Sequence, residues 1–388
     1  MIQRTISSIL KEQLSKTKKS ILLLGPRQVG KSTLLLQFNP SVSINLADEG
    51  QYRDHLRDPG LLRRLVEGAT GKGPILIDEV QRYPSMLNTV QALVDEKRRS
   101  FLLSGSSARK LRHGHANLLP GRIFNHTLFP LTYWELGKNF NLDKALKIGT
   151  LPEIYLEDYG TDLLRNYIDT YLREEIQAEA LARNLESFSR FIDLAAVVSG
   201  SIINYSQLAS DSEIPKETLR RFYDILFDTL MIHRIPGYTD IKGPRKAIQK
   251  EMVLFFDMGV KNGILKLERN QFTDTESGKL FEQWFILQLI AFSSYYNKGW
   301  KFYYYRDDRK TEVDLILDLG SKLIALEIKF SRKPKQEYFK GVNIFASVAK
   351  KPVRSIVIHR GDRVERWGDA EAIPFDRFLS EIDDLQDK

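Results

Sequence analysis

The sequence predicts an α/β protein of several domains, with a parallel-sheet core, a helical middle and a C-terminal α/β domain. Three observations support this prediction. The chain of 388 residues is long enough for two or three domains. Short apolar runs alternate with helical stretches through residues 1–135, as in a parallel sheet. A second group of apolar strands follows residue 300, after a long apolar helix.

Residues 25–33, Gly-Pro-Arg-Gln-Val-Gly-Lys-Ser-Thr, follow a short apolar run and precede three leucines. Their spacing fits G-x-x-x-x-G-K-[ST], a loop whose backbone N–H groups surround phosphates. Gly25 and Gly30 would keep side chains away from the anion, which the helix N-terminus attracts. Lys31 would reach the β- and γ-phosphates of ATP, and Ser32 would bind Mg²⁺. The expected nucleotide-binding residues are Gly25, Gln28, Val29, Gly30, Lys31, Ser32 and Thr33.

Residues 75–79, Ile-Leu-Ile-Asp-Glu, form an apolar strand that ends in two acids. Ligands of open α/β sheets bind at the carboxyl ends of strands. We therefore expect Asp78 to hold Mg²⁺ and Glu79 to polarise the attacking water; a solvated acidic turn is the alternative. The next apolar strand ends in small polar residues, of which Ser104 or Ser106 could sense the terminal phosphate unless they only end the strand.

An arginine that reaches the nucleotide would stabilise transition-state charge. Arg122, just past a Pro-Gly turn, is the first candidate and would act on the site of a neighbouring chain; a plain surface arginine is the alternative. Arg27, inside the phosphate loop, competes with it. Arg173, on an expected lid helix, is the third candidate.

The order of these motifs resembles a group of prokaryotic AAA-type P-loop ATPases. Their C-terminal domain of unknown function is itself similar to restriction endonucleases. The resemblance covers essentially the whole chain and rests on the phosphate loop and on the segments 77–81, 103–106 and 121–122. It implies an ATP site, Arg122 as the arginine acting in trans, and a homo-oligomer. The implied site residues are Gly25, Gly30, Lys31, Ser32, Asp78 and Glu79.

The middle of the chain has the spacing of a helix-turn-helix, in which two short helical stretches flank Ile214 and Pro215. Apolar strands after it could supply a wing. If this module binds DNA, Lys216, Arg220 and Arg221 would face the duplex. A rigid connector or protein-docking module is the alternative, and acidic neighbours on the same helix favour it.

A hairpin is expected where two apolar strands flank a Gly-Ser pair at 320–321, which suits a type II′ turn. That register places Asp314 opposite Glu327 and Glu312 opposite Lys329. Two opposed carboxylates repel each other unless a divalent metal lies between them. The alternative is a plain scaffold that is closed by a Glu312–Lys329 pair.

The hairpin resembles the D…ExK core of PD-(D/E)XK nucleases. The resemblance implies a second divalent metal on Asp314 and Glu327, and a catalytic role for Lys329. Glu282, on the long apolar helix, fits a further acid of that core. Val313 departs from the pattern, because the motif has proline there.

Composition limits the remaining choices. Lys and Arg number 58 against 50 Asp and Glu, a net charge of +8 that weakly favours acidic partners such as DNA or another nucleic acid. The chain has no cysteine, so disulfides and thiolate chemistry are excluded. No apolar run approaches the ~20 residues that span a bilayer, so we expect a cytoplasmic protein without a membrane partner.

We therefore expect a Mg²⁺-dependent AAA-type ATPase coupled to a nuclease-like domain that engages nucleic acid. The alternative function is an ATP-dependent switch or interaction module whose nuclease-like domain does not cleave. The expected domains are a P-loop ATPase core, a helical lid or linker, a winged-helix-like segment and a PD-(D/E)XK nuclease-like domain, over 1–135, 136–203, 204–265 and 266–388.

Overall fold

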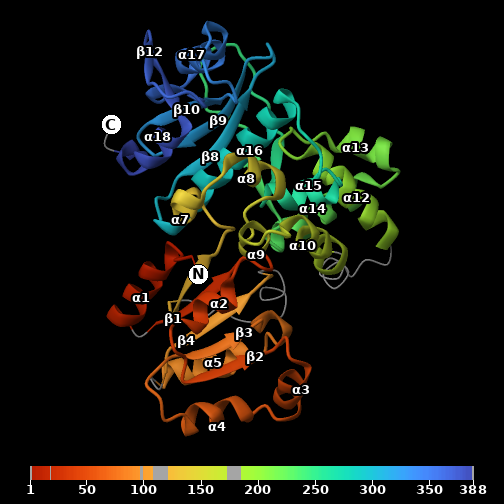
Figure 1. Ribbon diagram of the computed structural model, residues 1–388, viewed down its shortest axis with the longest axis vertical. Coiled ribbons are helices and arrows are strands. Elements are labelled where there is room, and N and C mark those ends of the chain that lie inside the picture. The colour runs from red at the N-terminus through yellow and green to blue at the C-terminus, as the bar shows by residue number, and fades with distance from the viewer. Residues whose placement is uncertain (1, 18, 97–98, 108–120, 173–184, 387–388) are drawn as a thin grey trace. The chain divides into compact units, whose positions relative to one another are not determined.

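The computed structural model describes the chain except for residues 1, 18, 97–98, 108–120, 173–184 and 387–388 (Figure 1). The chain divides into two compact units, each assembled from three segments. The N-terminal unit comprises Met1–Asn141, Thr150–Arg183 and Arg220–Ile232. The C-terminal unit comprises Leu142–Gly149, Asn184–Leu219 and His233–Lys388.

The N-terminal unit is built on a five-stranded parallel sheet with the order β2-β3-β4-β1-β5. Its inner strands are buried on both faces, which explains their continuous apolar runs. The strand bounds are β1 (Ser20–Leu24), β2 (Val42–Asn45), β3 (Ile75–Asp78), β4 (Phe101–Gly105) and β5 (Ile123–Thr127).

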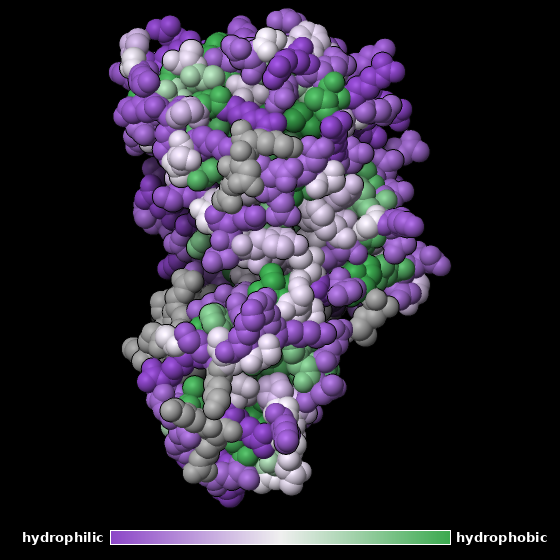
Figure 2. All heavy atoms as spheres, turned by 90° about the vertical axis from the view of Figure 1, so that its left-hand side faces the viewer, coloured by the Kyte–Doolittle hydropathy of each residue, from purple (hydrophilic) through white to green (hydrophobic). Residues whose placement is uncertain are grey.

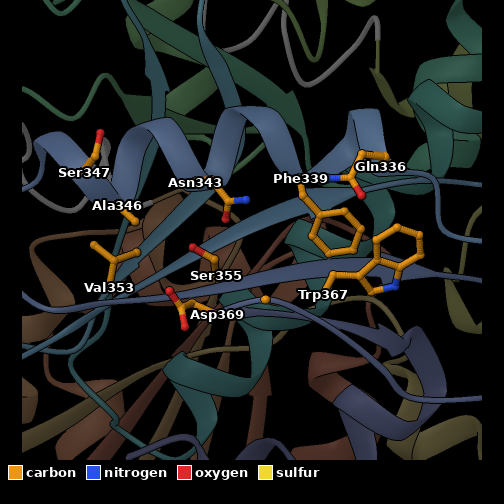
Figure 3. Close-up of a pocket in the computed structure, with 10 residues that line it drawn as sticks. Gln336, Phe339, Asn343, Ala346, Ser347, Val353, Ser355, Trp367 and Asp369 are labelled. Atoms are coloured by element: carbon orange, nitrogen blue, oxygen red, sulfur yellow. The ribbon is translucent and has the colours of Figure 1, made fainter.

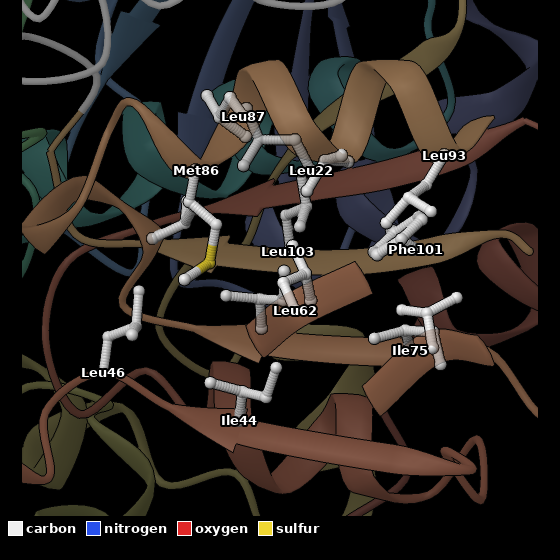
Figure 4. Packing of buried hydrophobic residues seen from close by; sticks show 14 residues of the cluster. Leu22, Ile44, Leu46, Leu62, Ile75, Met86, Leu87, Leu93, Phe101 and Leu103 are labelled. Atoms are coloured by element: carbon white, nitrogen blue, oxygen red, sulfur yellow. The ribbon is translucent and has the colours of Figure 1, made fainter. Parts of the chain in front are cut away.

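Helices α4 and α5 contribute to a hydrophobic core over the strands β2, β3 and β4. Leu62 of α4 and Met86, Leu87 and Leu93 of α5 gather around sheet residues such as Leu103 (Figure 4). The helices of this part are α1 (Ile6–Lys16), α2 (Lys31–Leu36), α3 (Glu49–Arg57), α4 (Leu61–Gly68) and α5 (Met86–Asp95), with a 3-10 turn over Val80–Arg82.

Mostly helical elements make up the middle of the chain. They are α7 (Tyr133–Leu136), α8 (Leu142–Ile148), α9 (Pro152–Leu156), α10 (Gly160–Asn166), a π-helical turn over Tyr167–Leu172, α12 (Leu185–Val198), α13 (Tyr205–Ser212), α14 (Lys216–Asp228), the paired strands β6 (Ile232–Pro236) and β7 (Glu251–Phe255), and α15 (Met258–Ile264).

The segment from α12 to β7 has the order helix, short bridge, helix, helix and two-stranded ribbon. The bridge joins Ile202 to Met252 of β7. Asn204 caps α13 through its side chain, and Glu213 ends that helix with a positive φ of 57°. Two helices and a ribbon therefore occur where a helix-turn-helix with wing strands was expected.

The C-terminal unit holds a mixed six-stranded sheet with the order β12-β13-β11-β10-β9-β8. Strands β8, β9 and β10 pair antiparallel, whereas β11 runs parallel to β10 and β13. The elements are α16 (Asp274–Tyr295), β8 (Lys301–Arg306), β9 (Glu312–Asp318), β10 (Leu323–Ile328), α17 (Phe339–Val348), β11 (Val353–His359), β12 (Glu365–Trp367), β13 (Ala370–Pro374) and α18 (Phe375–Ser380).

Helix α17 packs on one face of this sheet. Its Val342 and Phe345 join a buried cluster with Ile316 of β9 and Ala325 of β10. Helices α16 and α18 contact each other through aromatic rings, among them Phe281 with its centroid 5.5 Å from that of Phe375. Aromatic packing of this kind explains why α16 is apolar nearly all round.

The surface offers little further guidance to a binding face. On the face drawn in Figure 2, hydrophilic side chains predominate and hydrophobic ones form small separate groups. Within the described parts of the chain, no helix combines the length and the apolar character needed to cross a membrane.

Candidate nucleotide site and carboxylate cluster

The parallel register brings the predicted nucleotide-site residues to one edge of the N-terminal sheet. Leu24, which precedes the phosphate loop, pairs with Gly105 at the end of β4. The N–H of Gly25 continues this pairing by donating to the Gly105 carbonyl over 3.2 Å. Because β3 lies beside β4, Asp78 ends at the same edge. The structure thus gathers at this edge motifs that lie about fifty to eighty residues from the phosphate loop in the sequence.

The two glycines of the phosphate loop are required for different reasons. A Cβ on Gly25 would lie 2.5 Å from the carbonyl oxygen of Leu128, so a side chain there would collide with neighbouring backbone. The same atom on Gly30 would meet only ordinary contacts, but Gly30 has a φ of +91°. Gly25 is therefore also required by the Leu128 carbonyl, a cause that the motif alone does not indicate.

Lys31 is the first residue of α2 and is buried. Its Nζ donates to the carbonyls of Gly25 over 2.8 Å and of Pro26 over 2.9 Å. The ammonium therefore crosses the loop from its last residues to its first ones. Ser32 and Thr33 follow it in α2, and Val29 is fully buried before it.

Asp78 and Glu79 are held by residues of β4. The hydroxyl of Ser104 donates to Asp78 Oδ1 and accepts from the N–H of Glu79 over 3.2 Å. Glu79 has a φ of +57°, which turns the chain sharply after β3. The Ser104 hydroxyl thus fixes both acids relative to the strand that adjoins the phosphate loop.

Gln81 holds the Glu79 carboxylate from the other side. Its Nε2 donates to Glu79 Oε2 and, over 2.9 Å, to the hydroxyl of Ser106. Gln81 has no role in the motifs predicted from the sequence, where only its position two residues after Glu79 could have indicated one. The arrangement leaves the carboxylate oriented by neutral donors, which suits a group that polarises water.

Arg122 lies at the amino ends of the strands, whereas the phosphate loop lies at their carboxyl ends. Its carbonyl accepts from the N–H of Ser20 at the start of β1, and its side chain pairs with Asp95. Its side chain is 37% exposed, and its place at the start of the strands separates it from the nucleotide site of its own chain. Arg27 remains inside the loop, whereas Arg173 lies outside the described residues.

The hairpin register expected in the C-terminal unit is confirmed from Leu323 opposite Asp318 to Leu326 opposite Leu315. The turn closes with a hydrogen bond of 3.0 Å from the Leu319 N–H to the Lys322 carbonyl. Two-residue turns fix register because any slip would move the whole apolar face to the other side.

The regular pairing stops at Asp314, so the expected Glu312–Lys329 pairing is wrong. The N–H of Ile328 donates to Asp314 Oδ2 over 2.7 Å, a side-chain contact in place of a ladder bond. Lys329 Nζ lies 2.6 Å from Glu327 Oε1 and 3.3 Å from Asp314 Oδ2. Glu312 Oε2 instead lies 3.9 Å from Arg306 Nη1.

Electrostatics in this carboxylate cluster (Glu282, Asp314, Glu327 and Lys329) reflect burial of like charges. Burial, followed by the charge of Asp314, raises the pKa of Glu282 well above its ordinary value. The same two causes raise the pKa of Glu327 to about 8. Burial lowers the pKa of Lys329, but Asp314 and Glu327 outweigh it and the net shift is upward.

The cluster meets one test for a metal site and fails another. Glu327 Oε2 is buried and has no hydrogen-bond partner, which leaves a hard oxygen donor for a cation. In the described part of the chain, however, no three His, Cys, Asp or Glu side chains are grouped closely enough to hold a metal ion. Asp314 and Glu327 thus form a pair of carboxylates beside a lysine.

A separate pocket of about 620 Å³ lies beside α17 (Figure 3). Phe339 and Trp367 stack at one end of it, with ring centroids 5.1 Å apart. Asn343 and Ser347 of α17 line its length. The carboxylate cluster contributes none of the lining residues.

Comparison with protein families agrees with this site. Residues 17–137 match the model of an AAA domain. Residues 139–271 match a domain of unknown function (DUF8612), and residues 277–378 match another (DUF4143). The N-terminal part of the chain is accordingly an AAA-type P-loop ATPase-like domain, and such a domain implies nucleotide binding.

Relatives along most of the chain carry no assigned activity. Uncharacterised proteins of Mycobacterium bovis and Mycobacterium tuberculosis are each 28% identical over 329 residues, covering 81% of this chain and 71% of theirs. An uncharacterised protein of Haemophilus influenzae is 20% identical over 340 residues, covering 80% of this chain and 82% of its own.

Solved structures give distant similarity. AMPPCP-bound DnaA from Aquifex aeolicus is 15% identical with a TM-score of 0.30, covering 57% of this chain and 86% of that chain. The Aeropyrum pernix ORC1 protein in complex with DNA is 12% identical with a TM-score of 0.28, covering 69% and 93%.

Proposed function

We propose that this protein binds ATP with Mg²⁺ and hydrolyses it in the AAA-type domain. Lys31 and the loop N–H groups hold the phosphates. Ser32 and Asp78 bind Mg²⁺, and Glu79 orients water. One observation carries the proposal: Gly25, Asp78 and Ser104 lie at or near the carboxyl ends of neighbouring strands. The phosphate loop is therefore beside the two acids.

Nucleotide binding and turnover test this proposal separately. Calorimetry with ATP and Mg²⁺ should show binding by the wild type and by Glu79→Gln, but not by Lys31→Ala. Phosphate release should fall at least a hundredfold in Glu79→Gln, because water loses its general base. Arg53→Gln, an exposed arginine of α3, is the control. Undiminished turnover in Lys31→Ala would refute the assignment.

The C-terminal unit supports a second part of the proposal, a nuclease-like domain that engages DNA or another nucleic acid. Asp314 and Glu327 would hold a divalent ion, and Lys329 would stabilise charge on a phosphate. The buried, unpaired Glu327 Oε2 supports this reading. The stretch of chain that holds α13, α14 and the strands β6 and β7 would be the winged-helix-like segment. It lies in the sequence between the AAA-type domain and the nuclease-like domain.

An ATP-dependent switch with a non-cleaving domain is the second candidate function. It is favoured by Lys329, whose ammonium already neutralises both Asp314 and Glu327. In this case the domain would bind a partner without cutting, in a cytoplasmic protein.

Calorimetric titration with Mn²⁺ separates the two candidates. A metal site predicts binding that strengthens as pH rises toward 8, because the metal displaces a proton from Glu327. Glu327→Gln should abolish it, and Glu337→Gln, an exposed acid, should not. Binding together with Mn²⁺-dependent cleavage of DNA or RNA supports the nuclease; an absence of both supports the switch.

A further inference from the structure

We propose that Arg4 is a positioning residue of the nucleotide site, whose guanidinium fixes the Val29–Gly30 peptide so that the Gly30 N–H faces the phosphates. The inference rests on the proposed ATP site and deepens it. Arg4 precedes the AAA match at 17–137, and the phosphate-loop motif does not include it.

Arg4 is buried behind the loop, and its guanidinium contacts groups on three segments of the N-terminal unit, among them the following. Nη1 donates to the Val29 carbonyl over 2.6 Å, and Nη2 donates to the Phe129 carbonyl over 2.5 Å. Nε lies 3.1 Å from Glu135 Oε1. The planar guanidinium therefore joins the phosphate loop to the backbone that follows β5.

Glu135 is itself held in place. Its side chain is fully buried, at 0% exposure. Oε1 accepts from the N–H of Thr5 over 2.8 Å, and Oε2 accepts from the N–H of Thr132 over 3.0 Å, which forms a capping box at α7. A carboxylate fixed by two backbone donors neutralises the buried guanidinium and sets its orientation.

Peptide geometry carries the effect of Arg4 to the ligand side. A trans peptide is planar, so the Val29 C=O and the Gly30 N–H point in opposite directions. With its oxygen held by Arg4, this peptide directs the Gly30 N–H to the side away from Arg4. A phosphate loop binds its anion through such N–H groups. A hydrogen bond from a charged donor also polarises the amide and strengthens its N–H as a donor.

A purely structural Arg4 would make a different prediction. It would anchor the segment before α1, and its loss would lower stability without a specific effect on the anion. Positioning of Gly30 predicts weaker nucleotide binding in a protein that remains folded. Affinity for ATP and unfolding of the nucleotide-free protein therefore separate the two roles.

The experiment measures ATP and ADP binding with Mg²⁺ by calorimetry, and urea unfolding without nucleotide, in the full chain. Arg4→Gln should bind both nucleotides about tenfold or more weakly, because a hydrogen bond to a charged group is lost. Arg4→Lys keeps the charge but lacks the fork, so it should lie between Arg4→Gln and wild type. Arg53→Gln, an exposed arginine, should match wild type.

Hydrogen exchange gives an independent readout. Peptides that contain Gly30 should gain less protection from ADP in Arg4→Lys than in wild type. Wild-type affinity in a folded Arg4→Gln overturns the proposal; if Arg4→Gln does not fold, wild-type affinity in Arg4→Lys overturns it. If the wild type itself binds no nucleotide, the proposed ATP site fails first and Arg4 fails with it. Binding by wild type and loss only in the Arg4 variants supports both.

Discussion

Gly25 and Gly30 show how residues of one motif answer to different constraints. Gly30 supplies a backbone conformation that other residues adopt only with strain, as the motif implies. Gly25 instead makes room for the Leu128 carbonyl, a group about one hundred residues further along the chain. A local motif can thus include a residue that is fixed by tertiary packing.

Gly25→Ala should destabilise the N-terminal unit by about 1–3 kcal/mol, because its Cβ would lie 2.5 Å from the Leu128 oxygen and the backbone must shift. ATP affinity should fall as well. The matched control is Gly68→Ala at the end of α4, where a Cβ meets nothing within 4 Å. Urea unfolding measures the stability of both variants, and calorimetry measures their affinity for ATP. Equal unfolding free energies for the two variants would contradict the proposed cause.

The pKa of Glu327 makes stability depend on pH. Its value is about 8 when folded against an ordinary 4.5, so the folded protein binds more protons between these values. The contribution of Glu327 to the unfolding free energy therefore decreases as pH rises from about 5 to 8. Asp314, the second cause of the shift, adds repulsion once Glu327 ionises.

Glu327→Gln should remove this loss. Between pH 5 and 8, its unfolding free energy should fall less than that of wild type by about 1–3 kcal/mol, since the amide stays neutral. Urea unfolding at several pH values measures the difference. Glu337→Gln should follow the wild-type curve because Glu337 is exposed. Parallel curves for wild type and Glu327→Gln would show that the carboxyl is not shifted.

At the scale of elements, the side chain of Asn262 joins α15 to the end of α8 in the C-terminal unit. Asn262 of α15 donates through Nδ2 to the carbonyls of Leu146, over 2.8 Å, and Lys147, over 2.9 Å. These carbonyls lie in the last turn of α8, where no intrahelical donor is available. Gly259 allows the close approach, because its Cβ would lie 2.0 Å from the Ile148 oxygen.

Asn262→Ala should destabilise the C-terminal unit by about 1–3 kcal/mol, because a buried carbonyl and a partly buried one lose their donor. Asn262→Asp should be at least as harmful, since a carboxylate cannot donate to them. Thermal unfolding is the measurement, and Asn270→Ala, an exposed asparagine outside the helices, is the control. An Asn262→Ala protein as stable as the control would remove Asn262 from the account of α8.

Local pattern predicts several elements but not those set by distant contacts. The strands β1 and β3 and the long helix α16 follow from apolar runs, and the β9–β10 register follows from the length of its turn. Strand β5 was missed because Ile-Phe-Asn-His-Thr has no apolar run and pairs only at the sheet edge.

The residues of the candidate sites also fall into two groups, those that a short motif locates and those whose contacts form only on folding. Lys31, Asp78 and Glu79 could be located from spacing, because their chemistry is concentrated in short motifs. Arg4 could not, since folding brings it to Val29, and the position of Gln81 two residues after Glu79 does not show that its amide also reaches Ser106. The hairpin register could not show that Asp314 leaves the ladder to accept from Ile328.

At the scale of the whole molecule, an Arg122 that acts in trans would connect activity to assembly. Arg122 lies at the amino ends of the strands, opposite the phosphate loop, so a role in hydrolysis requires a second chain. Completion of a site by such an arginine is worth ~10³–10⁵ in rate. Turnover per chain should therefore rise with protein concentration until the oligomer is saturated.

Mixed variants test this arrangement. Arg122→Ala and Glu79→Gln should each be nearly inactive alone, because each lacks one part of every site. Their mixture should regain turnover, since an Arg122→Ala chain keeps Glu79 and can take Arg122 from its neighbour. A mixture of Arg122→Ala with wild-type-like Arg53→Gln serves as the dilution control. A mixture no more active than its components would place Arg122 outside the site.

The three-segment make-up of each unit also limits how this protein can be divided. The polypeptide passes between the N-terminal and C-terminal units five times. The family matches meet near residues 138 and 274, and a cut at either place would leave neither unit complete. A truncated gene that ends after the AAA match would omit α9 and α10. Exchange of the catalytic part between relatives by recombination at one crossover would disrupt both units, so their sequences are expected to have been inherited together.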